Sequence, residues 1–220
     1  MARYLITGAN RGIGLEFASQ LSAAGHEVIA LCRKASKELT ALKGVTIIDG
    51  VELKNFESLG SLNSKIDGEI DVVVNNAGVL FNDDMDALDF ASINAQMQIN
   101  AFAPLALVSA LSSKIKVGGK VVMITSRMGS IEDNSSGGYY GYRMSKAALN
   151  AASKSLSIDL KGKKVSVGIF HPGFVRTEMT GFQGTINPDQ SVSKILKLVD
   201  KLKLEDSGTF YHVNGSVLPW

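Results

Sequence analysis

The chain has little cysteine, little proline and no excess of one charge, and these shortages exclude several classes of protein. Its single cysteine, Cys32, cannot form an intramolecular disulfide and does not fit the two-cysteine zinc patterns. With 23 basic and 21 acidic residues the formal net charge is +2, and no basic block indicates a nucleic acid or membrane partner. The most apolar run, Ile99 to Leu111, is too short to span a bilayer. The start of the chain lacks a signal-peptide pattern, so we expect a soluble, cytoplasmic protein without a metal site.

Short aliphatic runs alternate with longer segments of helical spacing along the whole chain. The runs are nearly uniformly apolar, which is typical of strands covered by helices on both faces. With 220 residues and no linker of distinct composition, the sequence predicts one domain, residues 1–220, of α/β class. We expect a doubly wound parallel sheet of about seven strands, of Rossmann type. The expected strands are Tyr4–Thr7, Val28–Cys32, Val45–Asp49, Asp71–Asn75, Lys120–Thr125, Val165–Phe170 and Thr209–Val213.

A glycine-rich segment follows the first expected strand and begins the first helix. Its spacing is Gly-x-x-x-Gly-x-Gly, and glycines there let backbone N–H groups approach a pyrophosphate at the positive end of a helix. A strand-to-helix turn that uses glycine only for its geometry is the alternative. The position after the first strand favours a dinucleotide site, whose candidate residues are Gly8, Asn10, Arg11, Gly12, Ile13 and Gly14.

The end of the second expected strand indicates which dinucleotide is bound. An NAD site commonly has an acidic residue there for the ribose 2′-hydroxyl, whereas an NADP site has an arginine. This chain has Arg33 and Lys34 and no acid, and Arg11 supplies a further cation. These residues could be ordinary loop charges. The missing acid together with two separate arginines favours NADP(H) as the cofactor.

Tyr142 and Lys146 lie four residues apart at the start of a long helical segment, and therefore on one helix face. A nearby ammonium favours the phenolate, so we expect Lys146 to lower the pKa of Tyr142 toward the range of a general acid or base. A chance pair on a helix surface is the alternative. Tyr139 and Tyr140 are competing tyrosines, but only Tyr142 has a lysine four residues later.

Three further groups are expected at the same edge of the sheet. Ser126 follows the fifth strand, where a hydroxyl can hydrogen-bond a carbonyl, and Asn76, Ala77 and Gly78 follow the fourth. Pro104 cannot donate to the carbonyl of residue 100, so we expect a kinked helix and a free carbonyl that holds a water. Caps, turns and a simple helix bend are the alternatives.

These motifs together resemble the short-chain dehydrogenase/reductase family, and in particular its small C-factor/sniffer and carbonyl-reductase-like members. The resemblance extends along nearly the whole chain, and six motifs in one order are far more specific than any one of them. The motifs are Thr7-Gly8-x3-Gly12-x-Gly14, Asn75-Asn76-Ala77-Gly78, Asn100, Ser126, Tyr142-x3-Lys146 and Pro172-Gly173-x-Val175-x-Thr177.

The resemblance implies a role for each matching residue. Tyr142 would donate the proton, and Lys146 would bind the nicotinamide ribose and lower the pKa of Tyr142. Ser126 would orient the carbonyl, and Asn100 would hold a relay water. Leu53 would lie beside the adenine, although Glu52-Leu53 departs from the family's Asp-Val. The nicotinamide would pack against the turn that contains Pro172, Gly173, Val175 and Thr177.

The sequence therefore predicts an NADPH-dependent reductase of a small ketone or aldehyde substrate. An NADP-binding sensor or signalling protein with incidental turnover is the alternative, and it would not need the Asn, Ser, Tyr and Lys set. A sugar-nucleotide epimerase or dehydratase is a third alternative, but it would need an added substrate domain that this chain is too short to hold. Residues 94–114 and 141–160 carry more apolar positions than one buried face requires, including Met97, Phe102, Leu107, Ala151 and Leu156. We therefore expect a homodimer or homotetramer.

Overall fold

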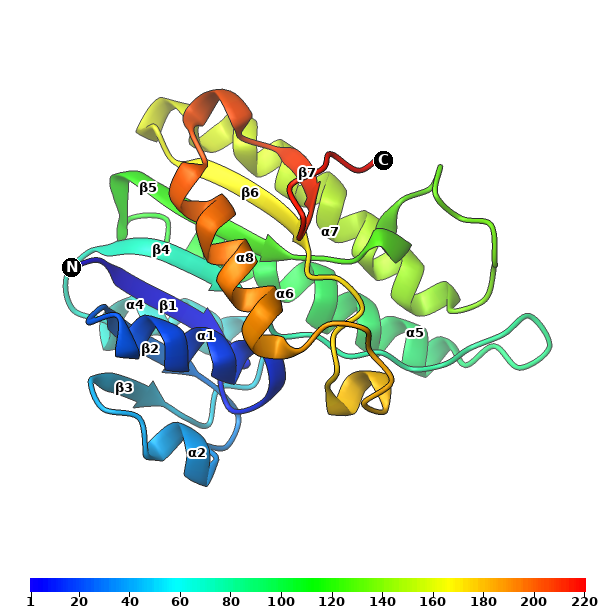
Figure 1. Cartoon of the computed structure of the whole chain (residues 1–220), viewed down its shortest axis with the longest axis horizontal. Helices are drawn as coiled ribbons and strands as arrows, with labels where there is room; N and C mark the ends of the chain where they lie inside the picture. The colour runs from blue at the N-terminus through cyan, green and yellow to red at the C-terminus, as the bar shows by residue number, and fades with distance from the viewer.

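Seven strands form one parallel sheet in the order β3-β2-β1-β4-β5-β6-β7 in the computed structural model, which describes residues 1–220. The chain order reverses between β1 and β4, and the carboxyl ends of the strands lie on the right in Figure 1. This is the single-domain Rossmann-type fold that the sequence predicts, so that prediction is confirmed. The strands are β1 Arg3–Thr7, β2 Glu27–Leu31, β3 Val45–Ile48, β4 Ile70–Asn75, β5 Ile115–Ile124, β6 Ser166–His171 and β7 Thr209–His212.

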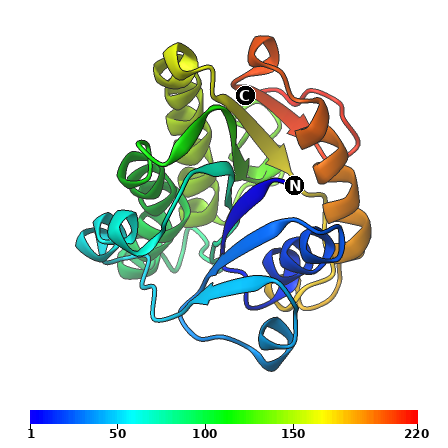
Figure 2. The same cartoon turned by 90° about the vertical axis from the view of Figure 1, so that its left-hand side faces the viewer.

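Helices cover both faces of the sheet. Helices α1 and α8 pack together on one face, and α5, α6 and α7 cover the other, as Figure 2 shows. The helix bounds are α1 Gly12–Ala23, α2 Lys37–Thr40, α3 Phe56–Gly60, α4 Leu62–Lys65, α5 Phe90–Met97, α6 Ala103–Ala110, α7 Tyr140–Asp159 and α8 Pro188–Lys201. No helix is both long and apolar enough to cross a membrane.

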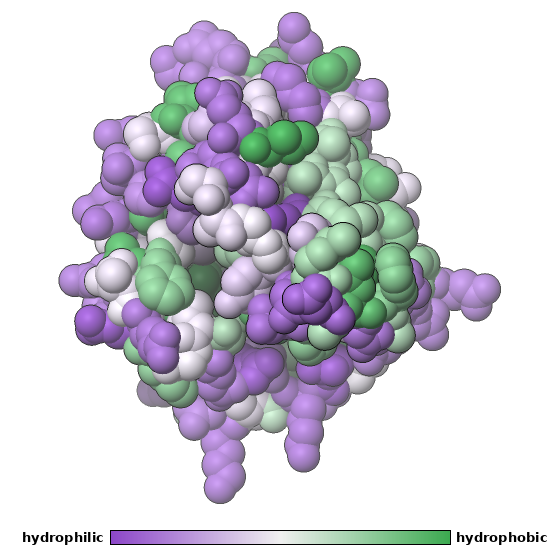
Figure 3. Space-filling model, turned by 90° about the vertical axis from the view of Figure 1, so that its right-hand side faces the viewer, coloured by the Kyte–Doolittle hydropathy of each residue, from purple (hydrophilic) through white to green (hydrophobic).

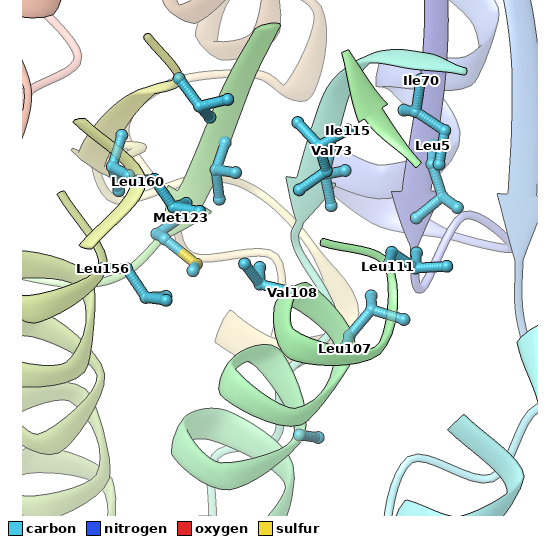
Figure 4. Close-up of a cluster of buried hydrophobic side chains, with 14 of the residues drawn as sticks. Leu5, Ile70, Val73, Leu107, Val108, Leu111, Ile115, Met123, Leu156 and Leu160 are labelled. Atoms are coloured by element: carbon cyan, nitrogen blue, oxygen red, sulfur yellow. The ribbon is translucent and has the colours of Figure 1, made fainter. Parts of the chain in front are cut away.

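Successive residues of each central strand enter different hydrophobic cores. In β1, Leu5 points into the core beneath α6 and α7, whereas Tyr4 and Ile6 belong to the core beneath α1 and α8. Figure 4 shows the first core, where Leu107 and Leu111 approach Leu5 and Val73. Because both faces are buried, these strands have no polar alternation, which explains their uniformly apolar sequence.

The helical segment around Asn100 is interrupted, as the proline predicts, but by a different geometry from a simple kink. A π-helical turn, Gln98–Phe102, separates α5 from α6, and Pro104 lies in the first turn of α6. Proline has no N–H for the preceding turn, and a wider π turn accommodates that missing hydrogen bond. The turn carries Asn100, which is fully buried.

Two of the residues expected at a subunit interface lie in the core instead. Leu107 is 0% exposed and Leu156 is 9% exposed, because both point toward the sheet. The apolar side chains that α5 to α7 and the turn between them leave exposed include Phe102, Leu105 and Ile158. Any interface on this face would use these residues.

Candidate active site

A cavity of about 680 Å³ opens at the carboxyl ends of the strands. In Figure 3 this side of the molecule is hollowed, with hydrophobic surface beside the hollow. The cavity runs from the first strand-to-helix turn to the start of α7, so it joins two motifs that are far apart in the sequence. The expected site residues that line it are Gly8, Asn10, Arg11, Gly12, Ile13, Arg33, Leu53, Asn76, Ala77, Gly78, Tyr142, Lys146, Pro172 and Thr177.

The glycine-rich turn holds the start of α1 against the end of β1. A Cβ atom at Gly14 would overlap the carbonyl oxygen of Gly8, so only glycine permits this approach. No side chain caps the N-terminus of α1, and its first turn contains no acidic residue. The free N–H groups and the positive end of the helix dipole suit a phosphate. The residues present therefore fit the pyrophosphate of a dinucleotide.

The segment after β4 is tied to the end of β1. The hydroxyl oxygen of Thr7 accepts hydrogen bonds from the backbone N–H groups of Asn76 and Ala77, both at 3.0 Å. The side-chain amide of Asn76 donates to the carbonyl of Thr7, also at 3.0 Å. These bonds fix the crevice at the point where the strand order reverses, which is where doubly wound sheets bind nucleotides.

The two arginines that the sequence predicts at the cofactor line the cavity in different states, and a third, Arg176, lines it as well. Arg33, which follows β2, is exposed and takes part in no ion pair. Arg11 forms an ion pair with Glu178, which follows the turn of Thr177. Of the two arginines that the sequence predicts at the cofactor, only Arg33 therefore has a guanidinium without a carboxylate partner.

Helix α7 brings Tyr142 and Lys146 to the inner end of the cavity. Both side chains are buried, and the Nζ atom of Lys146 lies 5.8 Å from the centre of the Tyr142 ring. The same Nζ atom donates a hydrogen bond of 3.0 Å to the carbonyl of Ile124 at the end of β5. Tyr139 is exposed and does not line the cavity, nor does Tyr140. The structure thus favours Tyr142 over the other two tyrosines.

The pKa of Tyr142 differs from what the sequence predicts. Burial raises it to about 12, and a hydrogen bond with Ser126 acts in the opposite direction. Burial also lowers the pKa of Lys146 to about 8. The net shift is therefore upward and not downward as the sequence predicts, because removal of the phenol from water outweighs the hydrogen bond with Ser126. Tyr142 is therefore a protonated phenol at neutral pH.

Five expected residues support the cavity without lining it. Ser126 and Asn100 are buried beside it, and Gly14 packs against the glycine-rich turn. A Cβ atom at Gly78 would lie 3.2 Å from Oδ1 of Asn100 and 3.6 Å from Nζ of Lys146, so these two side chains meet there. The other two, Gly173 and Val175, face Ile186 and the protein interior.

A family model described as short chain dehydrogenase matches residues 3–187. The chain belongs to the short-chain dehydrogenase/reductase family. It is 37% identical to the 1-hydroxy-2-glutathionyl-2-methyl-3-butene dehydrogenase of Rhodococcus sp. (strain AD45), with 100% of both chains covered. Carbonyl reductase Sniffer of D. melanogaster has a TM-score of 0.93, 29% identity and 100% coverage of both chains. The NADPH-bound carbonyl reductase from chicken fatty liver has a TM-score of 0.92 and 27% identity, covering 100% of this chain and 99% of that one.

Further residues that sequence reasoning did not find also line the cavity. Glu178, Met179 and Phe182 line the cavity directly after Thr177. Their position in the sequence, close after the turn that contains Thr177, was the available signal. Phe182 has a φ of 60°, a left-handed conformation that is uncommon for a bulky residue and that marks a constrained turn at the cavity.

Proposed function

We propose that the chain is an NADPH-dependent reductase that converts a ketone or aldehyde carbonyl to an alcohol. The observation that carries this proposal is the cavity itself, in which an uncapped helix N-terminus and a buried tyrosine–lysine pair share one space. A dinucleotide fits the first feature, and proton transfer to a carbonyl fits the second. The family membership supports oxidoreduction.

The cofactor would be held by the start of α1 and by the segments that follow β2, β3 and β6. The first turn of α1 would bind the pyrophosphate, Arg33 the ribose phosphate, Leu53 the adenine side, and Thr177 the nicotinamide amide. When bound, NADPH supplies a hydride to the carbonyl carbon. The preference for NADPH is supported by the unpaired Arg33 and by the absence of an acid after β2. The chicken carbonyl reductase, which has a similar fold, is bound to NADPH, and this supports NADPH as the cofactor.

Tyr142 would donate its proton to the carbonyl oxygen as negative charge develops there. Its raised pKa keeps the phenol protonated at neutral pH, which is the form that a reduction requires. Ser126, which is buried beside Tyr142, would hydrogen-bond the same oxygen and orient the carbonyl. Lys146 would bind the ribose and stabilise the phenolate that remains after proton transfer. Asn100, buried near Lys146, would place its backbone carbonyl to hold the water that returns the proton.

A panel of carbonyl compounds with NADPH and with NADH tests this proposal. Diketones, quinones and aldehydes cover the reductive direction. Alcohols with NADP⁺, including a glutathione-conjugated alcohol, cover the direction named by the Rhodococcus relative. We expect turnover with NADPH to exceed turnover with NADH. Tight NADPH binding without turnover of any compound would contradict the proposal and favour the sensor alternative.

The variant Tyr142→Phe tests the assignment of the proton donor. Loss of a general acid typically costs a factor of roughly 10² to 10⁴ in kcat, while the NADPH Kd should change little because the ring remains. Tyr140→Phe is the matched control, because Tyr140 lies on the same helix but does not line the cavity. A Tyr142→Phe enzyme that keeps more than about a tenth of the kcat would overturn the assignment.

A further inference from the structure

Two side chains hydrogen-bond the loop after β4, Gln96 from α5 and Asn100 from the π-helical turn that follows α5. Asn100 bonds both backbone groups of Val79, since its Oδ1 accepts from the N–H and its Nδ2 donates to the carbonyl, each at 2.8 Å. One helical turn earlier, Oε1 of Gln96 accepts from the N–H of Phe81 at 3.1 Å. Two residues of extended chain advance about 6.7 Å and four residues of helix about 6 Å. The two spacings match, so two side-chain amides one helical turn apart contact two loop residues that are two positions apart.

Asp83 is the next alternate residue of the loop, two positions after Phe81, and its carboxylate is buried. It is 3% exposed, and its Oδ2 accepts a hydrogen bond of 3.3 Å from Nε2 of Gln96. Its two oxygens also accept from the N–H of Gly141, at 3.1 and 3.2 Å. The carbonyl of Asp83 accepts from the N–H of Tyr139 at 2.9 Å. Both carboxylate oxygens and the backbone carbonyl of Asp83 are thus engaged with α5 or with the start of α7.

The start of α7 has no cap of its own. Its N-cap residue, Tyr139, has a left-handed φ of 52° and makes no side-chain hydrogen bond to the helix. The first N–H groups of a helix need acceptors, and a carboxylate there also interacts favourably with the helix dipole. Asp83, 58 residues away in sequence, provides this cap.

The contact at Gly141 is close. A Cβ atom there would lie 2.5 Å from Nε2 of Gln96 and 3.0 Å from Cα of Ile93. The first turn of α7 therefore rests directly on the Asp83–Gln96 pair. Tyr142 is the next residue, and four residues after Gly141 the Oγ of Ser145 accepts a hydrogen bond of 3.0 Å from Asn100. The network holds α7 on both sides of Tyr142.

We propose that Asp83, together with Gln96, is a positioning residue that holds the first turn of α7 so that the Tyr142 hydroxyl faces Ser126. This inference rests on the proposed reductase function. Misplacement of a reacting group by about 1 Å can cost a factor of roughly 10² in rate. Loss of the Asp83 cap should therefore reduce kcat more than it affects cofactor binding, because the phosphate-binding turn lies on α1.

The variant Asp83→Ala tests the inference, with Asp84→Ala as the matched control. Asp84 is an exposed neighbour in the same loop, and its Oδ1 accepts only from the nearby N–H groups of Asp86 and Ala87. We expect kcat to fall by about tenfold to a hundredfold in Asp83→Ala, with the NADPH Kd within about twofold of wild type. The apparent pKa of the pH–kcat profile should also shift, since Tyr142 loses its fixed relation to Ser126. Asp84→Ala should match wild type in all three measurements.

Asp83→Asn separates positioning from general destabilisation, because it keeps one oxygen that can accept from Gly141. We expect it to recover most of the kcat, and it carries the test if Asp83→Ala does not fold. A folded Asp83→Ala that keeps kcat and its pH profile within about twofold of wild type would overturn the inference.

Amide hydrogen exchange provides a readout that needs no turnover. Residues 140–146 should exchange faster in Asp83→Ala and not in Asp84→Ala. If the wild type reduces no carbonyl, the proposed function fails while this measurement still decides the anchoring role. Unchanged exchange in residues 140–146 would then refute it.

Discussion

Lys146 carries a cost in stability that the substitution Lys146→Met should reveal. The side chain is 4% exposed, and burial lowers its pKa from the ordinary value of 10.5 to about 8. Each pKa unit corresponds to about 1.4 kcal/mol, so the charged form costs the fold about 3 kcal/mol at neutral pH. Methionine has a similar length and no charge. The substitution leaves the carbonyl of Ile124 without its ammonium donor, which lowers the free energy of unfolding by about 1–3 kcal/mol.

The sign of the pH dependence follows from the lowered pKa. Below about pH 8 Lys146 is protonated in both states and the full cost is present. Between pH 8 and 10.5 the unfolded chain binds the proton more tightly, so wild-type stability gains from Lys146 as the pH rises. The methionine variant lacks this gain. We expect the stability of the variant relative to wild type to decrease by about 2–3 kcal/mol from pH 7 to pH 10.

Urea unfolding of both proteins at a series of pH values measures this difference. The comparison cancels the titration of Tyr142 and other groups that both proteins share. A difference that stays constant within about 0.5 kcal/mol from pH 7 to pH 10 would refute the reasoning, because it would mean that Lys146 is not held charged against its environment.

Three further predictions concern the cofactor, the acid range and assembly. Arg33→Asp should reverse the NADPH preference, since a carboxylate repels the 2′-phosphate and can bind a ribose hydroxyl; equal wild-type Kd values for NADPH and NADH would contradict the premise. Burial, and then the charges of His212, Arg127 and Lys146, lower the pKa of His171 to about 3, so only the unfolded chain gains its proton as the pH falls from 6.5. His171→Asn should therefore lose less stability than wild type between pH 6.5 and pH 4 in urea titrations, and parallel curves would count against this. The exposed Phe102, Leu105 and Ile158 favour a dimer or tetramer. A mass of 23.4 kDa in light scattering at micromolar concentration would contradict this prediction.

The sheet could be predicted from sequence because its strands are buried on both faces. A uniformly apolar run ends where the chain reaches the surface, so the expected and observed ends of most strands differ by no more than one residue. The exception is β5, which begins at Ile115 and not at Lys120. Gly118 and Gly119 lie in that early part, and the pairing with β4 shifts register there. Irregular pairing with two glycines has no periodic sequence signal.

The residues of the site could be predicted from spacing, but their electrostatics could not. A separation of four residues places Tyr142 and Lys146 on one face of any α-helix. The direction of a pKa shift depends on how much water surrounds the group, and burial is a property of the fold. The same limit applies to Arg11, since its partner Glu178 is 167 residues away in sequence.

Asp83 shows what kind of residue the sequence conceals and how a structure finds it. The run Asn82-Asp83-Asp84 has the composition of an exposed turn, so pattern reasoning gives Asp83 no role. The structure requires one, because the first N–H groups of α7 must have acceptors and its N-cap side chain supplies none. Accounting for those donors leads directly to the buried carboxylate of Asp83 and from it to Gln96. The helix that carries Tyr142 and Lys146 is therefore capped by a loop that also lines the cavity at Gly78 and Val79, and this couples the start of α7 to the wall of the cavity.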